Sequence, residues 1–114
     1  AGYAPMIKKQ DGLVDFNRTP EEIRRKIQAM NPWPGAYTYY KGKPLKLFEA
    51  KDGSESNPEE LLPGTIVFIK PEGIGIQTGK GILIVTRIQM PGKRIMDVSD
   101  FLKGNQIEIY HVLG

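Results

Sequence analysis

The sequence contains no cysteine and no long apolar run. Without cysteine, the chain has neither a disulfide framework nor a cysteine-ligated metal site. No apolar segment approaches the roughly 20 residues of a membrane span, and no signal peptide pattern is visible at the start. The chain opens on Ala1-Gly2 without an initiator methionine, so we expect a processed chain or an excised fragment. The lack of cysteine fits a reducing compartment, and we expect a cytoplasmic chain with no membrane partner.

Signals of catalysis are also scarce. His111 is the one histidine, and a lone histidine near the end of a predicted strand is interpreted as a structural or surface residue. Asp97 and Asp100 open a predicted short helix, where carboxylates complement the positive helix end. The glycines at 73–75 and 79–81 are typical of hairpin turns, and no nucleophile-elbow motif is present. We therefore predict no catalytic residue and no metal ligand, which disfavours an independent small enzyme.

The balance of charge favours a basic binding surface. The 114 residues carry a net charge of +3, and their number fits one domain with a modest core. Net charge is +5 over residues 8–51, −4 over 52–72 and +3 over 73–103. A basic chain interrupted by one acidic loop is typical of a polyanion-binding face with the loop pointing elsewhere. An ordinary, solvated surface of mixed charge remains the alternative.

One helix and a series of strands are expected. Thr19-Pro20-Glu21-Glu22 forms a capping box with proline at the first helical position, and Ile23, Ile27 and Met30 make one apolar stripe, so a helix is predicted over 20–30. Strand patterns bounded by turn residues follow at 36–40, 45–51, 64–70, 74–78, 82–90 and 107–112. The broken alternation at Phe48 predicts a bulge there.

The order of these elements predicts the fold class. A second short helix is expected at 98–103, with Gly104 as its C-cap, and 107–112 is expected to close the sheet as a last strand. The chain should then be mostly β with flanking helices. Short strands joined by tight turns favour an OB-like barrel of five to six strands with the N-terminal helix packed on it.

A stiff corner connects the helix to the first strand. Asn31-Pro32-Trp33-Pro34-Gly35 places the single tryptophan between two prolines. Each proline fixes its own φ and pushes the preceding residue out of the helical region, so Asn31 and Trp33 should be extended and the helix should stop near Met30. We interpret the corner as a structural motif that seats the helix on the barrel through Trp33.

Three basic segments are the candidate binding residues. They are Lys8 and Lys9 on the N-terminal arm, Lys41, Lys43 and Lys46 around a tight turn, and Lys93 and Arg94 on a second loop. Lysine and arginine beside aromatic residues suit nucleic-acid phosphates, and Tyr39 and Tyr40 precede the first loop. In the alternative interpretation, Trp33, Tyr37 and Tyr39 pack the helix onto the barrel.

Several motifs, in order over nearly the whole chain, resemble the C-terminal domain of methionyl-tRNA formyltransferase. The most specific pair is Asn31-Pro32-Trp33-Pro34-Gly35-Ala36 with Gln89-Met90-Pro91-Gly92-Lys93-Arg94. The others are Tyr3-Ala4-Pro5, Asp15-Phe16-Asn17, Arg25-Lys26-Ile27, Leu45-Lys46, Pro63-Gly64-Thr65-Ile66 and Thr78-Gly79-Lys80-Gly81.

The resemblance implies an organisation and a role. Residues 1–12 would be the end of a basic interdomain linker, and 13–114 the OB-like C-terminal domain. Such a domain offers a largely sequence-independent basic surface to initiator methionyl-tRNA and presents it to the catalytic N-terminal domain of the same polypeptide. The catalytic residues and the 10-formyltetrahydrofolate site belong to that N-terminal domain, so this chain should bind no cofactor and be catalytically silent alone. We expect a monomer.

The resemblance leaves a second function open. Related C-terminal domains occur in other formyltransferases, including folate dehydrogenases and sugar-nucleotide enzymes, where they act as spacers or help to shape the substrate site. In that case the chain would act by docking on its catalytic domain, through apolar surface near Trp33 or Tyr37.

Overall fold

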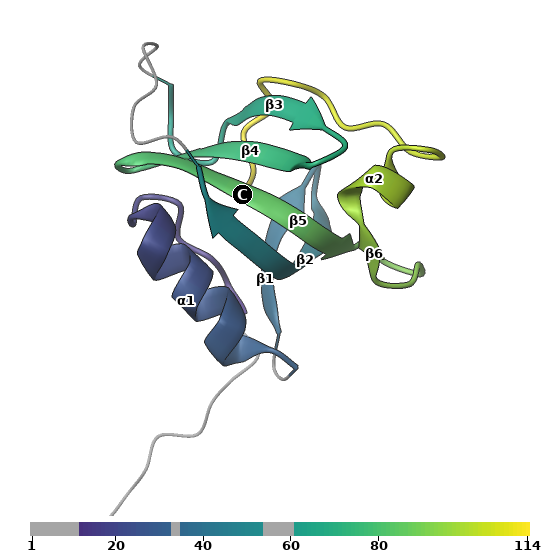
Figure 1. The fold of residues 1–114 in the computed structure, drawn as a ribbon, viewed down its shortest axis with the longest axis horizontal. Coiled ribbons are helices and arrows are strands. Elements are labelled where there is room, and N and C mark those ends of the chain that lie inside the picture. The colour runs from purple at the N-terminus through teal and green to yellow at the C-terminus, as the bar shows by residue number, and fades with distance from the viewer. Residues whose placement is uncertain (1–11, 33–34, 54–60) are drawn as a thin grey trace, which may run out of the picture.

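The computed structural model describes residues 12–32, 35–53 and 61–114, and the chain in this part is an antiparallel sheet flanked by two helices (Figure 1). The elements in chain order are α1 (Pro20–Met30), β1 (Ala36–Tyr40), β2 (Lys43–Asp52), β3 (Ile66–Lys70), β4 (Gly73–Thr78), β5 (Gly81–Gln89), β6 (Met96–Asp97) and α2 (Val98–Phe101). The predicted fold class, mostly β with flanking helices, is confirmed.

The six-stranded sheet has the order β1-β2-β5-β4-β3, with β6 paired to β5 beside this path. All of these pairs are antiparallel. The expected bulge is confirmed, because the β2–β5 register shifts between Leu47 and Glu49, on either side of Phe48. The sheet is not closed, since β1 and β3 are its two edges and do not pair with each other.

Helix α1 begins and ends where the sequence predicts. The Thr19 hydroxyl accepts a hydrogen bond from the Glu22 backbone amide, and the Glu22 carboxylate accepts one from the Thr19 amide, which completes the capping box. Asn31 is extended, with φ −94° and ψ 144°. Its side-chain amide donates to the carbonyls of Ile27 (2.7 Å) and Leu47 (3.0 Å), which ties the end of α1 to β2.

The described residues of the corner are also anchored to the end of α1 by the backbone. Gly35 has φ +93°, a region that favours glycine, and its amide donates to the Met30 carbonyl at 2.8 Å. The peptide bond between Asn31 and Pro32 is cis. Trp33 and Pro34, and with them the proposed role of the tryptophan ring, lie outside the described residues.

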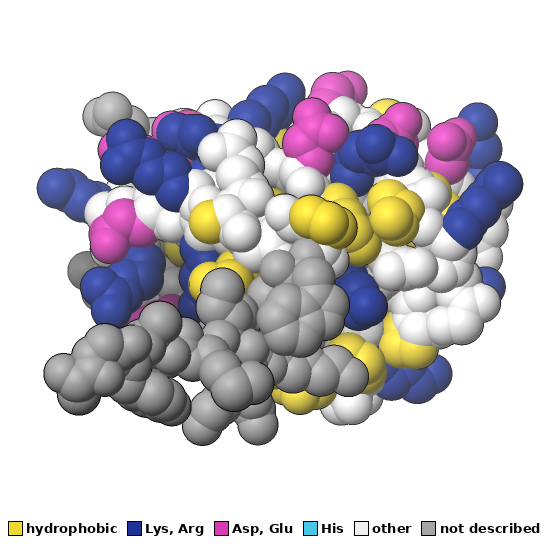
Figure 2. All heavy atoms as spheres, turned by 90° about the horizontal axis from the view of Figure 1, so that it is seen from below, with side chains coloured by type: hydrophobic (Ala, Val, Ile, Leu, Met, Phe, Trp, Pro, Cys, Tyr) yellow, Lys and Arg dark blue, Asp and Glu magenta, His cyan; other side chains and the backbone are white. Residues whose placement is uncertain are grey.

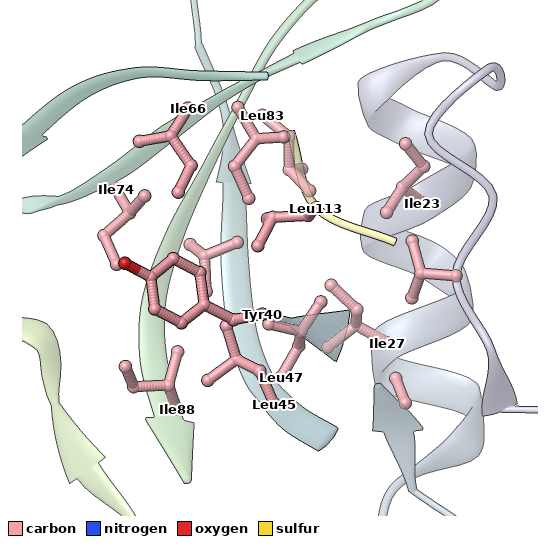
Figure 3. Packing of buried hydrophobic residues seen from close by; sticks show 14 of the residues in the cluster. Ile23, Ile27, Tyr40, Leu45, Leu47, Ile66, Ile74, Leu83, Ile88 and Leu113 are labelled. Carbon is pink, nitrogen blue, oxygen red and sulfur yellow. The ribbon is translucent and has the colours of Figure 1, made fainter. Parts of the chain in front are cut away.

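The core fills the concave side of the sheet and the space beneath α1 (Figure 3). Ile23 and Ile27 of α1 point toward Leu47 and Leu113, and both are at most 2% exposed. Tyr40 lies in the same cluster at 8% exposure, with its hydroxyl accepting a hydrogen bond from the Glu108 amide at 3.0 Å. The predicted packing of the N-terminal helix on the sheet is confirmed.

The start of α1 is seated against the β4–β5 turn at a second point. The Gly79 amide donates to the Arg18 carbonyl at 3.1 Å. A Cβ atom on Gly79 would lie 2.0 Å from the Asn17 carbonyl oxygen, so this approach of two backbones requires glycine.

The C-terminal region differs from the prediction. Residues 107–112 are not a strand, because Tyr110 turns with φ +66° and only an isolated bridge joins Thr65 to Val112. The expected helix over 98–103 ends at Phe101 with Leu102 as its C-cap, and Gly104 is not among the glycines with positive φ. The two-residue strand β6 has no counterpart among the predicted elements.

The C-terminal segment nevertheless contacts both edges of the open sheet. It runs from α2 past β3 in Figure 1, and the Tyr110 and Leu113 amides donate to the carbonyls of Ile66 and Gly64. The Gly114 amide then donates to the Tyr39 carbonyl of β1 at 2.9 Å. On β1, the Val14 amide donates to the Tyr37 carbonyl at 2.9 Å. Irregular chain therefore occupies edge positions that a barrel would fill by strand pairing.

Candidate nucleic-acid interface

The predicted cations divide between two sides of the sheet. Lys41 lies in the β1–β2 turn, Lys43 and Lys46 lie on β2, and Lys93 and Arg94 follow β5. Lys8 and Lys9 lie outside the described residues. Side chains alternate between the faces of a strand, so Lys43 and Lys46, three residues apart and before the bulge, project from opposite faces. The turn cations thus do not form one cluster.

Lys46 projects from the outer face of the sheet. It is opposite Tyr37 of β1 and Gln89 of β5, and paired residues lie on the same face. Its neighbours Leu45 and Leu47 are at most 3% exposed and belong to the core. Lys46 is itself exposed.

Lys41 is held by an acidic partner. Its Nζ lies 2.5 Å from Oε1 of Glu108, a residue 67 positions away in the chain. The hydrogen bond from Lys41 lowers the pKa of Glu108 below its ordinary value of 4.5. The same bond raises the pKa of Lys41 above its ordinary value of 10.5. Both groups are charged at neutral pH, and a phosphate would have to compete with Glu108 for this lysine.

A groove on the outer face brings Lys46 close to the second basic loop. Its volume is about 270 Å³, and it lies between the start of β2 and the end of β5. Its lining residues are Pro44, Lys46, Gln89, Met90, Pro91 and Gly92. Lys93 and Arg94 follow Gly92 directly and are both exposed.

Hydrogen bonds fix the loop beside this groove. The Lys93 amide donates to the Met90 carbonyl at 3.1 Å and forms a tight turn. The Gln89 side-chain amide donates to the Lys93 carbonyl at 2.8 Å. We did not predict Pro44, Gln89, Met90 or Pro91 as site residues, because the groove depends on the pairing of β2 with β5. Gln89, Met90 and Pro91 do stand in the motif that carried the family resemblance.

The tyrosines of β1 have different surroundings. Tyr40 is core-facing and therefore not available for stacking, which corrects the expectation for this residue. Tyr39 is 37% exposed and lies opposite Pro44 on the outer face. Tyr37 and Tyr39 pack edge to face, with ring centroids 5.6 Å apart. Tyr37, opposite Lys46, is half-buried, and the more exposed Tyr39 also lines a second hollow near the C-terminal segment.

The cations of the α1 region are already engaged. Arg24 pairs with Asp52 at 3.0 Å and Arg25 with Glu21 at 2.6 Å. Lys26 donates to the Leu13 carbonyl at 2.7 Å. Arg18 lies 3.7 Å from both Asp15 and Glu22. The positive charges in and just before α1 are thus paired with nearby carboxylates or with a backbone carbonyl.

The predicted cations beyond Lys41 have no such partner. Within residues 12–32, 35–53 and 61–114, Lys43, Lys46, Lys93 and Arg94 form no ion pair. Lys51, Lys70 and Lys80 also form none there, although nothing in the sequence distinguished them. Figure 2 shows that lysine and arginine side chains are dispersed over one face, with aspartate and glutamate among them along its upper edge. At the groove, a cation without an ion-pair partner among the described residues, Lys46, lines a hollow, and two more, Lys93 and Arg94, follow on the adjoining loop.

Carboxylates and histidine do not gather in the described part of the chain. No three such side chains are placed there to hold a metal ion. His111 packs edge to face on Tyr40, with ring centroids 4.8 Å apart, as expected of a structural residue. Asp97 lies 3.2 Å from Arg87, so this helix-terminal carboxylate also joins α2 to β5. Within the same residues, no helix is long and apolar enough to span a membrane.

Comparisons with known proteins agree on one family. Residues 6–106 match the model of the formyl transferase C-terminal domain. The chain is 41% identical to the methionyl-tRNA formyltransferase of Lachnospira eligens, over 98% of this chain and 36% of that protein. It is 39% identical to the enzyme of the same name from Clostridium novyi, over 97% of this chain and 35% of that protein. The chain thus spans about a third of the length of these relatives.

Solved structures share the fold. HypX from Aquifex aeolicus, in complex with tetrahydrofolic acid, superposes with a TM-score of 0.68 and 23% identity, over 89% of this chain and 18% of that one. A variant of the same protein gives the same TM-score at 24% identity. At this level of identity the likeness concerns the fold alone.

Proposed function

This chain belongs to the formyl transferase C-terminal domain family, and from that premise we propose that it is the tRNA-binding C-terminal domain of a methionyl-tRNA formyltransferase. In this proposal it holds initiator methionyl-tRNA by largely sequence-independent phosphate contacts. It presents the tRNA to a separate catalytic domain of the same cytoplasmic polypeptide, where 10-formyltetrahydrofolate supplies the formyl group. The chain alone then acts as a monomeric binding module without transfer activity or cofactor.

The observation that supports this proposal best is the state of the cations at the groove. A phosphate contact releases bound counterions when the cation is free to neutralise it. Lys46, Lys93 and Arg94 are exposed and form no ion pair within the described residues. The α1 cations, by contrast, already have partners. The names of the curated relatives supply the identity of the RNA.

Salt dependence tests the proposal directly. The 114-residue chain and fluorescently labelled tRNA are titrated by anisotropy between about 50 and 200 mM salt, where phosphate contacts make affinity fall steeply. The double variant Lys93→Glu/Arg94→Glu should bind more weakly while its thermal unfolding stays unchanged. Binding no tighter than to an uncharged polymer at low salt overturns the proposal, and unchanged binding by the variant removes this loop from the interface.

A second candidate function is a spacer domain of another folate-dependent formyltransferase, which acts by docking on its catalytic domain. Apolar side chains near the C-terminal segment favour it, since Leu13, Leu62 and Val112 are 42%, 69% and 42% exposed. Leu13, Pro63 and Leu113 also line a hollow of about 230 Å³. Leu62→Ser/Val112→Ser should then weaken binding to the separately produced catalytic domain and leave tRNA binding unaffected. The opposite result excludes this candidate.

A further inference from the structure

We propose that the outer groove between β2 and the β5–β6 loop holds one unpaired nucleotide of the bound RNA. The base would lie between Pro44 on one side and Met90 and Pro91 on the other. Its phosphate would face Lys46, Lys93 and Arg94. This inference rests on the proposed function, and it adds a preference for unpaired RNA that phosphate contacts alone do not produce.

The size and walls of the groove suit a flat ring. Its volume of about 270 Å³ lies just below the roughly 300 Å³ at which small-molecule sites begin. Pro44, Met90 and Pro91 give it apolar sides. Tyr39, which is 37% exposed, is paired with Pro44 on the neighbouring strand and also lines the hollow near the C-terminal segment. Rings of this kind are the surfaces on which unpaired bases stack without regard to sequence.

Polar groups at the groove are placed for a base edge and a phosphate. Gln89 lines the groove while its amide nitrogen donates to the Lys93 carbonyl. Its carbonyl oxygen has no hydrogen-bond partner within the described residues and is an acceptor for a base amino or imino group. Lys46 lines the groove from β2, paired with Gln89 of β5, and Lys93 closes the turn to which the Gln89 side chain is bonded.

The combination of charge and apolar lining distinguishes this groove from the other large hollow. The hollow near the C-terminal segment has a similar volume, about 230 Å³, but its charged lining residue is Asp15, an acid. A carboxylate there repels a phosphate, whereas Lys46 lines the groove and Lys93 and Arg94 follow its lining residue Gly92 in the chain. A paired helix buries its base faces in its own stack, so the apolar walls are of use to an unpaired nucleotide.

The experiment compares two RNA hairpins that differ by one nucleotide. One carries a single unpaired 2-aminopurine in its stem, and the other has a fully paired stem. The chain should bind the first about tenfold more tightly, equivalent to roughly 1.4 kcal/mol. Acrylamide quenching of 2-aminopurine emission should fall at least about twofold on binding, because a base in the groove is shielded from the quencher.

Two proline variants test whether the preference for the unpaired hairpin arises at the groove. Pro44→Ala removes a groove wall and should reduce the preference for the unpaired hairpin by about threefold, as expected for the loss of roughly one buried methylene. Pro71→Ala, an exposed proline in the β3–β4 turn, is the matched control and should leave the preference intact. Thermal unfolding checks that both variants fold, and the quenching readout on the unaltered chain needs no variant.

The outcomes separate this inference from the proposed function. Equal, salt-dependent binding of the two hairpins overturns the nucleotide site but leaves the tRNA-binding function standing. A preference for the unpaired hairpin that Pro44→Ala does not reduce places the base elsewhere and also overturns the site. Failure to bind either hairpin at low salt overturns both proposals.

Discussion

The basic residues around α1 and those around the outer groove have the same chemistry but different roles. Near α1, Arg24, Arg25 and Lys26 are bound to a carboxylate or a carbonyl of the chain itself. Beside the groove, Lys46, Lys93 and Arg94 have no ionic partner among the described residues. The two regions contribute similar positive charge to the sequence. Of the two, the cations beside the groove are the ones available to a polyanion. Stability and RNA binding should therefore respond to changes in different regions.

The largest effect is expected on stability, from the core beneath α1. Ile27 is fully buried, so Ile27→Ala should lower the free energy of unfolding by about 2–5 kcal/mol, as is usual for such truncations. Urea denaturation measures this change. Gln28→Ala, an exposed neighbour, should stay within about 0.5 kcal/mol. At temperatures where Ile27→Ala remains folded, its tRNA affinity should be unchanged, and a parallel loss of affinity would break the division between the regions.

The second-largest effect is expected on tRNA affinity, from the loss of cations at the outer groove. Lys46→Met/Lys93→Met should weaken tRNA binding roughly tenfold or more near 0.1 M salt and reduce the slope of log affinity against log salt by about two. Anisotropy titrations at several salt concentrations give both quantities.

The matched control for that experiment removes the same charge from the α1 region. Arg18→Gln/Arg25→Gln breaks exposed ion pairs, so it should cost less than about 1 kcal/mol of stability and leave the slope as it is. Equal slopes for the two double variants would show that net charge, not pairing, governs binding.

A smaller effect on stability is expected at the start of α1. Thr19→Ala removes the hydroxyl that accepts from the Glu22 amide and should cost about 0.5–2 kcal/mol. Thr19→Ser retains the oxygen and is the matched control. Thermal unfolding measures both variants, and a Thr19→Ser loss as large as that of Thr19→Ala would argue against the capping role.

The smallest effect is expected on tRNA binding, from a variant that frees a paired lysine. Glu108→Gln removes the partner of Lys41 and should steepen the salt slope of tRNA binding by up to about one. An unaltered slope would place Lys41 outside the interface.

The same pair predicts a pH dependence of stability. Lys41 lowers the pKa of Glu108, so the carboxylate stabilises the fold above its ordinary value of 4.5, and this contribution is lost as the pH falls through the lowered folded pKa. Glu108 raises the pKa of Lys41, so the lysine's contribution is present below 10.5 and is lost as the pH rises through the raised value. Unfolding of Glu108→Gln between pH 2 and 5 should therefore depend less on pH than that of the unaltered chain.

Local signals were sufficient for the elements whose contacts are local. The capping box at Thr19 and the prolines after Asn31 predicted the bounds of α1, because both act within a few residues. The Lys41-Gly42 turn and the bulge at Phe48 were predicted in the same way. The strand expected over 107–112 was wrong because the chain turns at Tyr110, with φ +66°, and this turn prevents a continuous ladder beyond the isolated bridge between Thr65 and Val112.

The candidate site was predicted only in part, for a related reason. Lys93 and Arg94 were predicted because the chain gives them no packing role. Their meeting with Lys46 follows from the β2–β5 register, which aligns Lys46 with Gln89 across more than forty residues of sequence. The pairing of Lys41 with Glu108 spans 67 residues. Neither contact leaves a periodic pattern in the sequence, so neither was visible before the fold.

The bonds that residues 13–14 and 110–114 make to β1 and β3 also bear on self-association. An exposed edge strand offers unpaired amides and carbonyls on which another chain can add a strand and begin to aggregate. Here Val14 and Gly114 bind the carbonyls of Tyr37 and Tyr39 on one edge, and Tyr110 binds the Ile66 carbonyl on the other. A sheet that never closes into a barrel is thus protected from intermolecular β-pairing by irregular chain, at positions where closure would have provided the same protection.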